Sequence, residues 1–285
     1  MNIEFTFEYP HTSWAGFHVF RNYYDYFTNK YKKFNVDYVN SSKHFNGNPS
    51  GPYAAQTMVI KNKDNGKYLV VTYWDRPDEV TWDGNGWDDK NCVEIITSAG
   101  FIQHPKFQPF SYLSYNMSYD TLSLNALKMT EKTKNDLVFR GYLYAERYSL
   151  AQVGLLDVND KKIFPETNYF QDLTNNKICL SLNGAGQICN RDMEILGARS
   201  VLLREELTSK FYNELIPNYH YVTYEHSSDA ETQSKIILEK FSEISKDKKL
   251  MRKIAENGYK WYQKNATVES NFKILKKIIN IQKLD

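Results

Sequence analysis

The sequence predicts a two-domain α/β protein in which each domain is built around a parallel sheet. Its 285 residues exceed the usual length of a single domain, about 100–150 residues. Short apolar segments typical of buried strands alternate with segments that carry apolar residues at helical spacing. Hydrophobic residues make up 41% of the chain and aromatic residues 15%, which is enough for a sizeable core. This alternation favours parallel strands covered by helices on both faces.

The first half of the chain shows several strand patterns. Apolar and polar side chains alternate over residues 2–9, and a helix is expected to follow. Residues 61–67 contain an Asn-Gly turn signal that leads into KYLVVTYW, the strongest strand pattern of this half. Two prolines and several aromatic residues predict an irregular connector at 101–120 that contains the domain boundary. Strands are expected at 2–9, 34–39, 67–74 and 92–100, and either a helix or a strand at 53–60.

The second half alternates between strands and helices more clearly. Its last three helical segments carry apolar residues at i, i+3, i+4 and i+7. The final one, 266–284, is amphipathic and is expected to pack back on the first domain. Strands are expected at 134–143, 177–184, 200–205 and 219–225, and helices at 145–156, 187–198, 229–245, 248–265 and 266–284.

Charge and composition exclude several classes of function. The 36 Lys and Arg residues nearly balance the 34 Asp and Glu residues, which argues against a nucleic-acid partner. No segment has the apolar length of a membrane span, and the first residues lack the pattern of a signal peptide, so we expect a soluble, cytoplasmic protein. The three cysteines form no CxxC pair and the six histidines are scattered. We therefore expect no disulfide, no metal and no cofactor.

The candidate binding residues lie just after strands of the second half. In open α/β sheets, ligands bind beyond the carboxyl ends of the strands, where helix N-termini expose backbone N–H groups. Arginines, a glycine turn and one carboxylate occupy such places here: Arg140, Gly141, Arg147, Gly184, Gly186, Arg191 and Glu194.

These residue types suit a nucleoside diphosphate-sugar. Gly184 and Gly186 would let the backbone approach a phosphate, and arginine forks bind phosphate oxygens in a bidentate way. Glu194 lies one helical turn after Arg191 and could accept hydrogen bonds from ribose or sugar hydroxyls. Two structural alternatives stay open, because a Gly-x-Gly before a helix is often only a turn, and an Arg-x-x-Glu pair is often a solvated ion pair.

Three segments carry a resemblance to known glycosyltransferases. LVFRGYLYAERYSL resembles the arginine-bearing segment of the capsule-associated and protein O-glucosyltransferase family, and the stretch KICLSLNGAGQICNRDMEILGARSVLLRE resembles that family's glycine turn, arginine helix and following strand. The Arg191-x-x-Glu194 helix is also similar to that of the exostosin-like glycosyltransferases. IAENGYKWYQKNAT is similar to a helix near the end of many glycosyltransferase-B (GT-B) enzymes. The resemblance covers about residues 134–265, and it departs where the family has Asp-Gly and this chain has Asn183-Gly184.

The resemblance implies a domain plan. A GT-B enzyme has two Rossmann-like parallel-sheet domains with a cleft between them and a C-terminal helix that crosses back. Residues 1–115 would then bind the acceptor, residues 116–265 the nucleotide-sugar donor, and residues 266–285 would form the crossing helix. The implied reaction transfers a sugar from a nucleotide-linked donor, such as UDP-xylose or UDP-glucose, to a glycan hydroxyl.

The first half supplies candidates for the acceptor site. Asp75 ends the strongest strand of this half and opens a loop that contains aromatic rings suited to stacking on sugars, so Asp75 is the leading candidate for the catalytic base. His11, after the first strand, is the alternative, and either residue could instead have only a local turn or helix-entry role. The aromatic candidates for acceptor binding are Trp74, Trp82 and Trp87.

The sequence thus predicts a glycosyltransferase that is metal-independent and inverting. Metal independence is inferred because Asp88-Asp89 lacks Asp-x-Asp spacing and arginines can offset charge on the leaving diphosphate. Two alternatives remain at this stage: an enzyme resembling nucleotide-sugar epimerases, and a non-enzymatic carbohydrate-binding protein.

Overall fold

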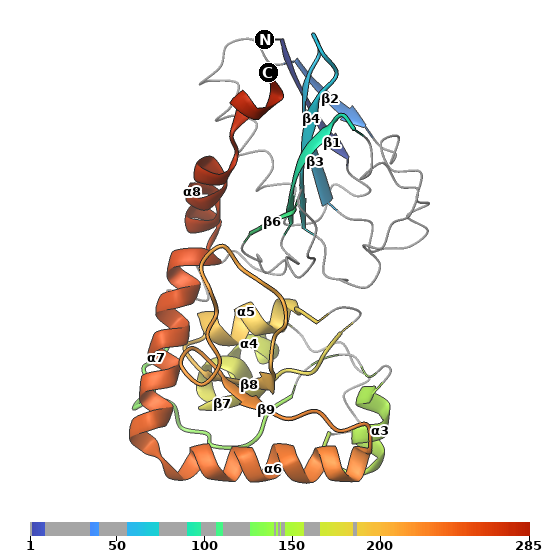
Figure 1. Cartoon of the computed structure of the whole chain (residues 1–285). Coiled ribbons are helices and arrows are strands. Elements are labelled where there is room, and N and C mark those ends of the chain that lie inside the picture. Colours follow the sequence, from blue (N-terminus) through green and yellow to red (C-terminus); the bar gives the residue numbers. More distant parts are fainter. Residues whose placement is uncertain are drawn as a thin grey trace. The chain divides into compact units, whose positions relative to one another are not determined.

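The computed structural model shows a mixed α/β protein, and each of the two sheets among the described residues contains parallel strands (Figure 1). The chain divides into two compact units, one of Met1–Asn116, Ser209–Asn213 and Val268–Asp285, the other of Met117–Thr208 and Glu214–Thr267. The assignment of acceptor and donor roles to parts of the chain stays a prediction. The structure describes residues 2–8, 35–39, 56–73, 90–97, 107–110, 126–139, 141, 143, 146–156, 166–184 and 187–285.

The first unit contains a mixed sheet with the strand order β2-β1-β3-β4-β5-β6. Strand β3 runs antiparallel to both of its neighbours, and the other neighbouring pairs are parallel. The strands are β1 (Ile3–Glu8), β2 (Asn35–Val39), β3 (Gln56–Asn62), β4 (Tyr68–Tyr73), β5 (Cys92–Thr97) and β6 (Phe107–Pro109).

The expectation of a fully parallel sheet in the first half is therefore wrong at β3. The cause is the turn between β3 and β4, which is too short for the crossover of a dozen or more residues that parallel strands need. Its backbone closes with hydrogen bonds from Asn62 N to Lys67 O (2.8 Å) and from Gly66 N to Asn62 O (2.8 Å). Gly66 has φ +80°, a left-handed conformation that glycine adopts without strain. The Asn-Gly signal thus marks a hairpin, and the ambiguous segment 53–60 contains a strand.

The end of the chain is fastened to this hairpin. The carbonyl oxygen of Leu284 accepts hydrogen bonds from the side-chain amides of Asn62 (2.9 Å) and Asn65 (2.8 Å). Lys283 pairs with the buried carboxylate of Glu94 on β5. The expected single helix over 266–284 is divided into α8 (Val268–Ile278) and a 3₁₀ turn (Ile281–Leu284), and both belong to the first unit.

The second unit contains a short parallel sheet with the order β7-β8-β9. These strands lie where the sequence predicts them, at Ile178–Leu180, Val201–Glu205 and Val222–Tyr224. The predicted strand at 134–143 is not a regular strand among its described residues, although it does lie beside β7 through parallel bridges at Lys134 and Val138.

The helices of the second unit cover this sheet. Helix α5 packs on β8, and α6 packs on β9 (Figure 1). Helix α4 was not expected from the sequence. The helices are α3 (Glu146–Gln152), α4 (Glu166–Asn175), α5 (Asn190–Gly197), α6 (Ala230–Lys246) and α7 (Lys248–Asn265).

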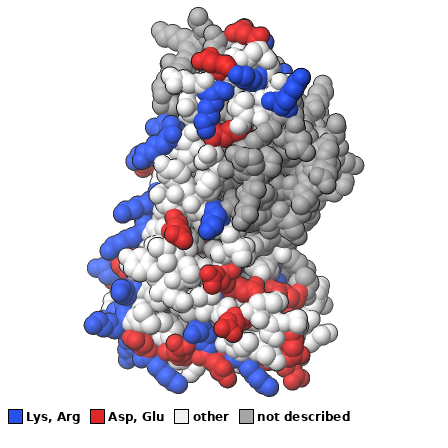
Figure 2. All heavy atoms as spheres, viewed as in Figure 1, with Lys and Arg blue, Asp and Glu red and all other residues white. Residues whose placement is uncertain are grey.

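Helix α7 has one apolar face and one basic face. Asp247 begins the helix, and its side chain accepts hydrogen bonds from the backbone N–H groups of Lys249 (3.1 Å) and Leu250 (2.9 Å). Figure 2 shows basic side chains along the edge of the molecule that α7 forms. The exposed basic residues of this helix are Lys248, Lys249, Arg252, Lys253, Lys260 and Lys264.

The apolar face of α7 depends on a glycine. A Cβ atom at Gly258 would lie 2.4 Å from the backbone oxygen of His220 and 2.7 Å from a methyl group of Leu196. The loop that carries His220 is held in place, because its imidazole Nδ1 accepts a hydrogen bond from Ile216 N (2.8 Å). Trp261 and Asn265, one and two turns further on, are also buried. Burial lowers the pKa of His220 to about 4, so this loop packs with a neutral imidazole at pH 7.

We predict that Gly258→Ala destabilises the protein by about 1–3 kcal/mol, the usual cost of overpacking a core. Alanine favours a helix by about 1 kcal/mol over glycine, but a backbone oxygen at 2.4 Å cannot move aside as a side chain can. Urea denaturation would measure the change. Lys253→Ala, at an exposed position of the same helix, is the control and should change stability by less than about 0.5 kcal/mol. A Gly258→Ala protein as stable as the wild type would contradict the close packing.

Candidate functional site

The candidate site lies at the carboxyl ends of β7, β8 and β9. The three strands are parallel, so the segments that follow them meet at one edge of the sheet. Ser181–Gly184 follow β7, Glu205 ends β8, and His226 comes two residues after β9. Helix α5 begins at the same edge, with Cys189 as its N-cap.

A buried ion pair between Arg204 and Asp192 forms the centre of this edge. Both side chains are 0% exposed. Asp192 also accepts a hydrogen bond from the backbone N–H of Cys189 (2.8 Å), which closes the first turn of α5. Arg204 donates further hydrogen bonds to Asn183 Oδ1 (3.0 Å) and to the Gln187 carbonyl (2.9 Å). The ion pair therefore joins the end of β8 to the start of α5 and to the loop after β7.

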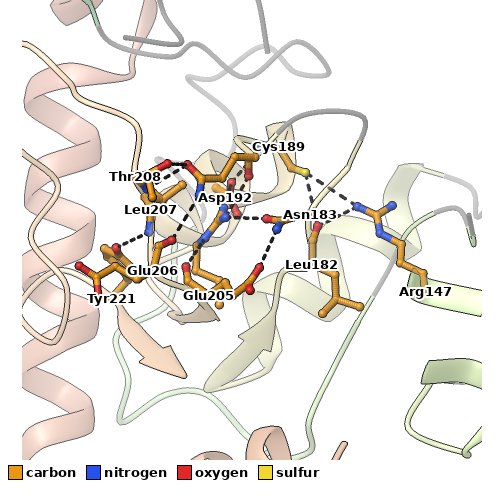
Figure 3. A network of polar contacts seen from close by, with 12 residues as sticks. Arg147, Leu182, Asn183, Cys189, Asp192, Glu205, Glu206, Leu207, Thr208 and Tyr221 are labelled. Atoms are coloured by element: carbon orange, nitrogen blue, oxygen red, sulfur yellow. Dashed lines mark hydrogen bonds and ion pairs between the residues drawn. The ribbon is translucent and has the colours of Figure 1, made fainter. Parts of the chain in front are cut away.

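A chain of polar contacts leads from this pair through Asn183 to Glu205 (Figure 3). Asn183 donates from Nδ2 to Glu205 Oε2 at 2.6 Å. The other carboxylate oxygen of Glu205 lies 2.6 Å from Nδ1 of His226, whose side chain is 55% exposed. Burial raises the pKa of the nearby Glu146, and the Glu205 carboxylate raises it further. The rim of the site thus carries two carboxylates and an accessible imidazole.

Arg147 lies on the other side of the loop after β7. It is buried on α3 and donates to the Leu182 carbonyl (2.8 Å) and to Cys189 Sγ (3.8 Å), as Figure 3 shows. Its guanidinium carbon is 5.4 Å from the centre of the Phe139 ring. The sequence placed Arg147 at this edge, and the structure does the same.

Arg191 contacts the same aromatic ring from α5. Its guanidinium carbon lies 4.4 Å from the centre of the Phe139 ring, a cation–π distance. Gly141 makes room for it, because a Cβ atom there would lie 1.9 Å from Nη2 of Arg191. This gives Gly141 a packing role beside the arginine.

Positive charge surrounds the Cys189 thiol at the start of α5. Arg191, Arg147 and Arg204 all act to lower its pKa. Burial outweighs them and, together with Asp192, raises the pKa of this thiol above its ordinary value. Cys189 is therefore a neutral thiol at pH 7 and contributes no negative charge to the start of α5.

Glu194 has a partner within the second unit. It is buried, and its carboxylate accepts a hydrogen bond from the hydroxyl of Tyr169 on α4. Burial raises the pKa of Tyr169 well above its ordinary value, and the Glu194 charge raises it further. Arg191 and Glu194 are thus both buried, and the alternative of a solvated surface pair is wrong for them. The role of Glu194 toward a ligand hydroxyl stays a prediction.

The structure brings together Gly141, Arg147 and Arg191 around Phe139, and it places Gly184 directly after Asn183 in the polar chain. Arg204, Asp192 and Glu205 were missed by sequence reasoning. The available signal was the abrupt change from Val201-Leu202-Leu203 to Arg204-Glu205-Glu206 at the end of a buried strand. The remaining predicted residues lie outside the described residues: His11, Trp74, Asp75, Trp82, Trp87, Arg140 and Gly186.

Two further searches concern only the described part of the chain. It contains no group of three or more His, Cys, Asp or Glu side chains arranged to hold a metal ion. None of its helices combines the length and the apolar character needed to cross a membrane.

Comparison with known protein families finds no family model that matches this chain, and comparison with curated protein sequences finds no significant match.

We predict that Asn183→Asp destabilises the protein by about 1–3 kcal/mol at pH 7. The variant replaces a donor 2.6 Å from Glu205 Oε2 by a second carboxylate, and a hydrogen bond to a charged group contributes about 1.5–3 kcal/mol. Arg204, already paired with Asp192, offsets only part of this loss.

The predicted destabilisation has a pH dependence. Two adjacent carboxylates hold a proton to higher pH than one alone. The folded variant therefore binds more protons than the unfolded chain, and the deficit in stability should shrink as the pH falls from 7 to 5. Denaturation at several pH values would measure it, with Gln171→Glu at an exposed position of α4 as the control for added charge. A deficit that is constant with pH would exclude the carboxylate pair as its cause.

Proposed function

We propose that this protein is a glycosyltransferase that transfers a sugar from a nucleotide-sugar, in particular a UDP-sugar such as UDP-glucose or UDP-xylose, to a glycan hydroxyl. The observation that carries the proposal is the convergence of Arg147 and Arg191 on Phe139 beside the first turn of α5, at the carboxyl edge of a parallel sheet. Guanidinium groups and a helix N-terminus are the groups that bind a diphosphate and offset charge on it as it leaves. The resemblance of residues 134–265 to GT-B glycosyltransferases supports the same reaction.

We assign donor binding and acceptor activation to different parts of the chain. The second unit binds the donor, with Arg140, Gly186 and Gly184 completing the phosphate contacts. The acceptor lies against Trp74, Trp82 and Trp87, and Asp75, or His11 as the alternative, removes the proton from the attacking hydroxyl. An inverting attack approaches the sugar carbon from the side opposite the diphosphate, so the base belongs to the part of the chain that does not hold the donor.

A panel of nucleotide-sugars provides the first experiment. A ligand present at 100 times its dissociation constant raises the stability of the folded state by about 2.7 kcal/mol, and a melting assay detects this as a higher Tm. Slow hydrolysis of the stabilising donor, and transfer when a glycan is added, would identify a transferase. Conversion of the donor into a different nucleotide-sugar without an acceptor would instead identify an epimerase, and stabilisation by glycans alone would identify a carbohydrate-binding protein.

We predict that Arg191→Ala weakens UDP binding by about 10–100-fold, because a hydrogen bond between charged groups contributes about 1.5–3 kcal/mol. Calorimetric titration of UDP would measure the change. The control is Arg252→Ala, which removes an exposed arginine from α7 and should leave the affinity unchanged. A folded Arg191→Ala protein that binds UDP with wild-type affinity would remove Arg191 from the site.

We predict that Asp75→Asn lowers turnover by about 10²–10⁴-fold, the range typical of a lost general base. Donor affinity should stay nearly unchanged, because the donor residues follow position 134. Initial rates of transfer, measured beside UDP titrations, separate the two effects. If Asp75→Asn transfers normally and His11→Ala does not, the base is His11. If both remain active, neither residue is the base.

A further inference from the structure

We propose that Glu205 binds a pair of adjacent hydroxyl groups of the nucleotide-sugar, that is, a vicinal diol, at the carboxyl end of β8. The inference rests on the proposed function, since it names a contact made to the same ligand. Glu205 was not singled out by the sequence, and the structure alone brings it to the site.

The order of elements places Glu205 where nucleotide-binding sheets hold their hydroxyl acceptor. Strand β7, the turn at Gly184, helix α5 and strand β8 follow one another, and β7 pairs with β8 in parallel. In β-α-β units that bind nucleotides, an acidic residue about 20 residues after the glycine turn ends the second strand and accepts hydrogen bonds from ribose hydroxyls. Glu205 is the last residue of β8 and has this spacing from Gly184.

The Glu205 carboxylate has acceptor capacity left for two hydroxyls. An ionised carboxylate offers about four lone-pair sites on its two oxygens. One oxygen accepts a hydrogen bond from Asn183 (2.6 Å), and the other lies 2.6 Å from Nδ1 of His226. Each oxygen therefore keeps a second acceptor direction. The side chain is 18% exposed, so a ligand at the edge of the sheet can reach it.

The surroundings hold this carboxylate in one orientation. Asn183 contacts it from the loop after β7, and His226 contacts it from the segment after β9. Asn183 is in turn fixed by Arg204, so the contact is anchored in the buried ion pair. Glu146 adds a second carboxyl group nearby, whose pKa is raised by burial and further by the Glu205 charge.

The two carboxylates considered for hydroxyl binding differ in accessibility. Glu194 is 2% exposed and already accepts a hydrogen bond from Tyr169. Glu205 is more exposed and lies on the rim beside the accessible ring of His226. The geometry therefore favours Glu205 over Glu194 as the carboxylate that binds the hydroxyls of a ligand.

A diol can come from the ribose or from the transferred sugar, and a titration experiment distinguishes the two. The full-length wild type, Glu205→Gln and Glu206→Gln would be titrated with UDP, 2′-deoxy-UDP and UDP-glucose. Glu206 is the adjacent exposed glutamate, so Glu206→Gln controls for the loss of one negative charge. Each protein's Tm is measured first, and Glu205→Asp, which keeps the charge but withdraws the carboxylate, replaces Glu205→Gln if that variant does not fold.

We expect the Glu205 variant to lose affinity only for probes whose hydroxyl groups Glu205 binds. A ribose contact predicts that the wild type binds UDP about 10-fold more tightly than 2′-deoxy-UDP and that the Glu205 variant loses this preference. A contact to the transferred sugar predicts unchanged UDP binding and a loss of about 10-fold for UDP-glucose. Glu206→Gln should behave as the wild type in both cases.

Two results would overturn the inference, and they are distinguishable. If the wild type binds the probes and the folded Glu205 variant binds each with the same affinity, Glu205 holds no diol and the proposed function stands. If the wild type binds none of the three probes, the proposed UDP-sugar function fails, and this inference fails with it.

Discussion

The second unit depends on one constraint: Arg204 and Asp192 are fully buried, so each must be neutralised and hydrogen-bonded by its surroundings. Removing a charged group from water costs several kcal/mol, and the attraction of its partner repays this only when the remaining donors and acceptors are satisfied. The hydrogen bonds of Arg204 to Asn183, Gln187 and the Glu205 carbonyl meet that requirement for the guanidinium. On the other side of the pair, Oδ2 of Asp192 accepts hydrogen bonds from Arg204 and from the backbone N–H of Cys189. Since these partners come from different segments, the charge pair fixes the loop after β7, the start of α5 and the end of β8 together.

The buried arginines at this edge contact different groups, a difference that the sequence does not show. Arg204 pairs with Asp192 and donates hydrogen bonds to the segments that end β8 and follow β7, so it holds the carboxyl edge of the sheet together. Arg147 donates to the Leu182 carbonyl, and both Arg147 and Arg191 lie against the ring of Phe139 beside the first turn of α5. Their positive charge raises the local potential at a helix N-terminus, where an anion is already favoured. The diphosphate contact is therefore proposed for Arg147 and Arg191.

The helix pattern Ala255, Gly258, Trp261 and Asn265 has a packing explanation. Gly258 lets α7 approach the His220 backbone, and the Asn265 amide donates to the Trp261 carbonyl within the buried face (2.8 Å). Lys132 binds the carboxyl ends of two other helices, because its ammonium group donates to the Thr174 carbonyl of α4 and to the Ala198 carbonyl at the end of α5. This buried lysine donates to the Ala198 carbonyl (3.0 Å), and burial lowers its pKa to about 8. These residues hold the helices that pack around the sheet carrying the site.

The sequence by itself determined most of the helices and strands in the described part of the chain, and the place of the residues proposed to bind the donor. Helices α6 and α7 and strand β8 follow directly from periodic or continuous apolar patterns, because burial requires an apolar face of matching period. Arg147, Gly184 and Arg191 could be placed at the sheet edge for the same reason, since parallel strands bring their carboxyl ends together.

Only the tertiary structure decided the direction of β3 and the partners of the polar residues. The direction follows from a turn too short for a crossover, a constraint of three-dimensional closure that strand patterns do not express. The roles of Arg204 and Glu205 depend on Asp192, Asn183 and His226, which lie on other segments of the chain. The sequence pattern of a charged residue after a strand is the same whether that residue contacts solvent, a ligand or a buried counter-ion. Its partners, and hence its function, are set by contacts distant in sequence.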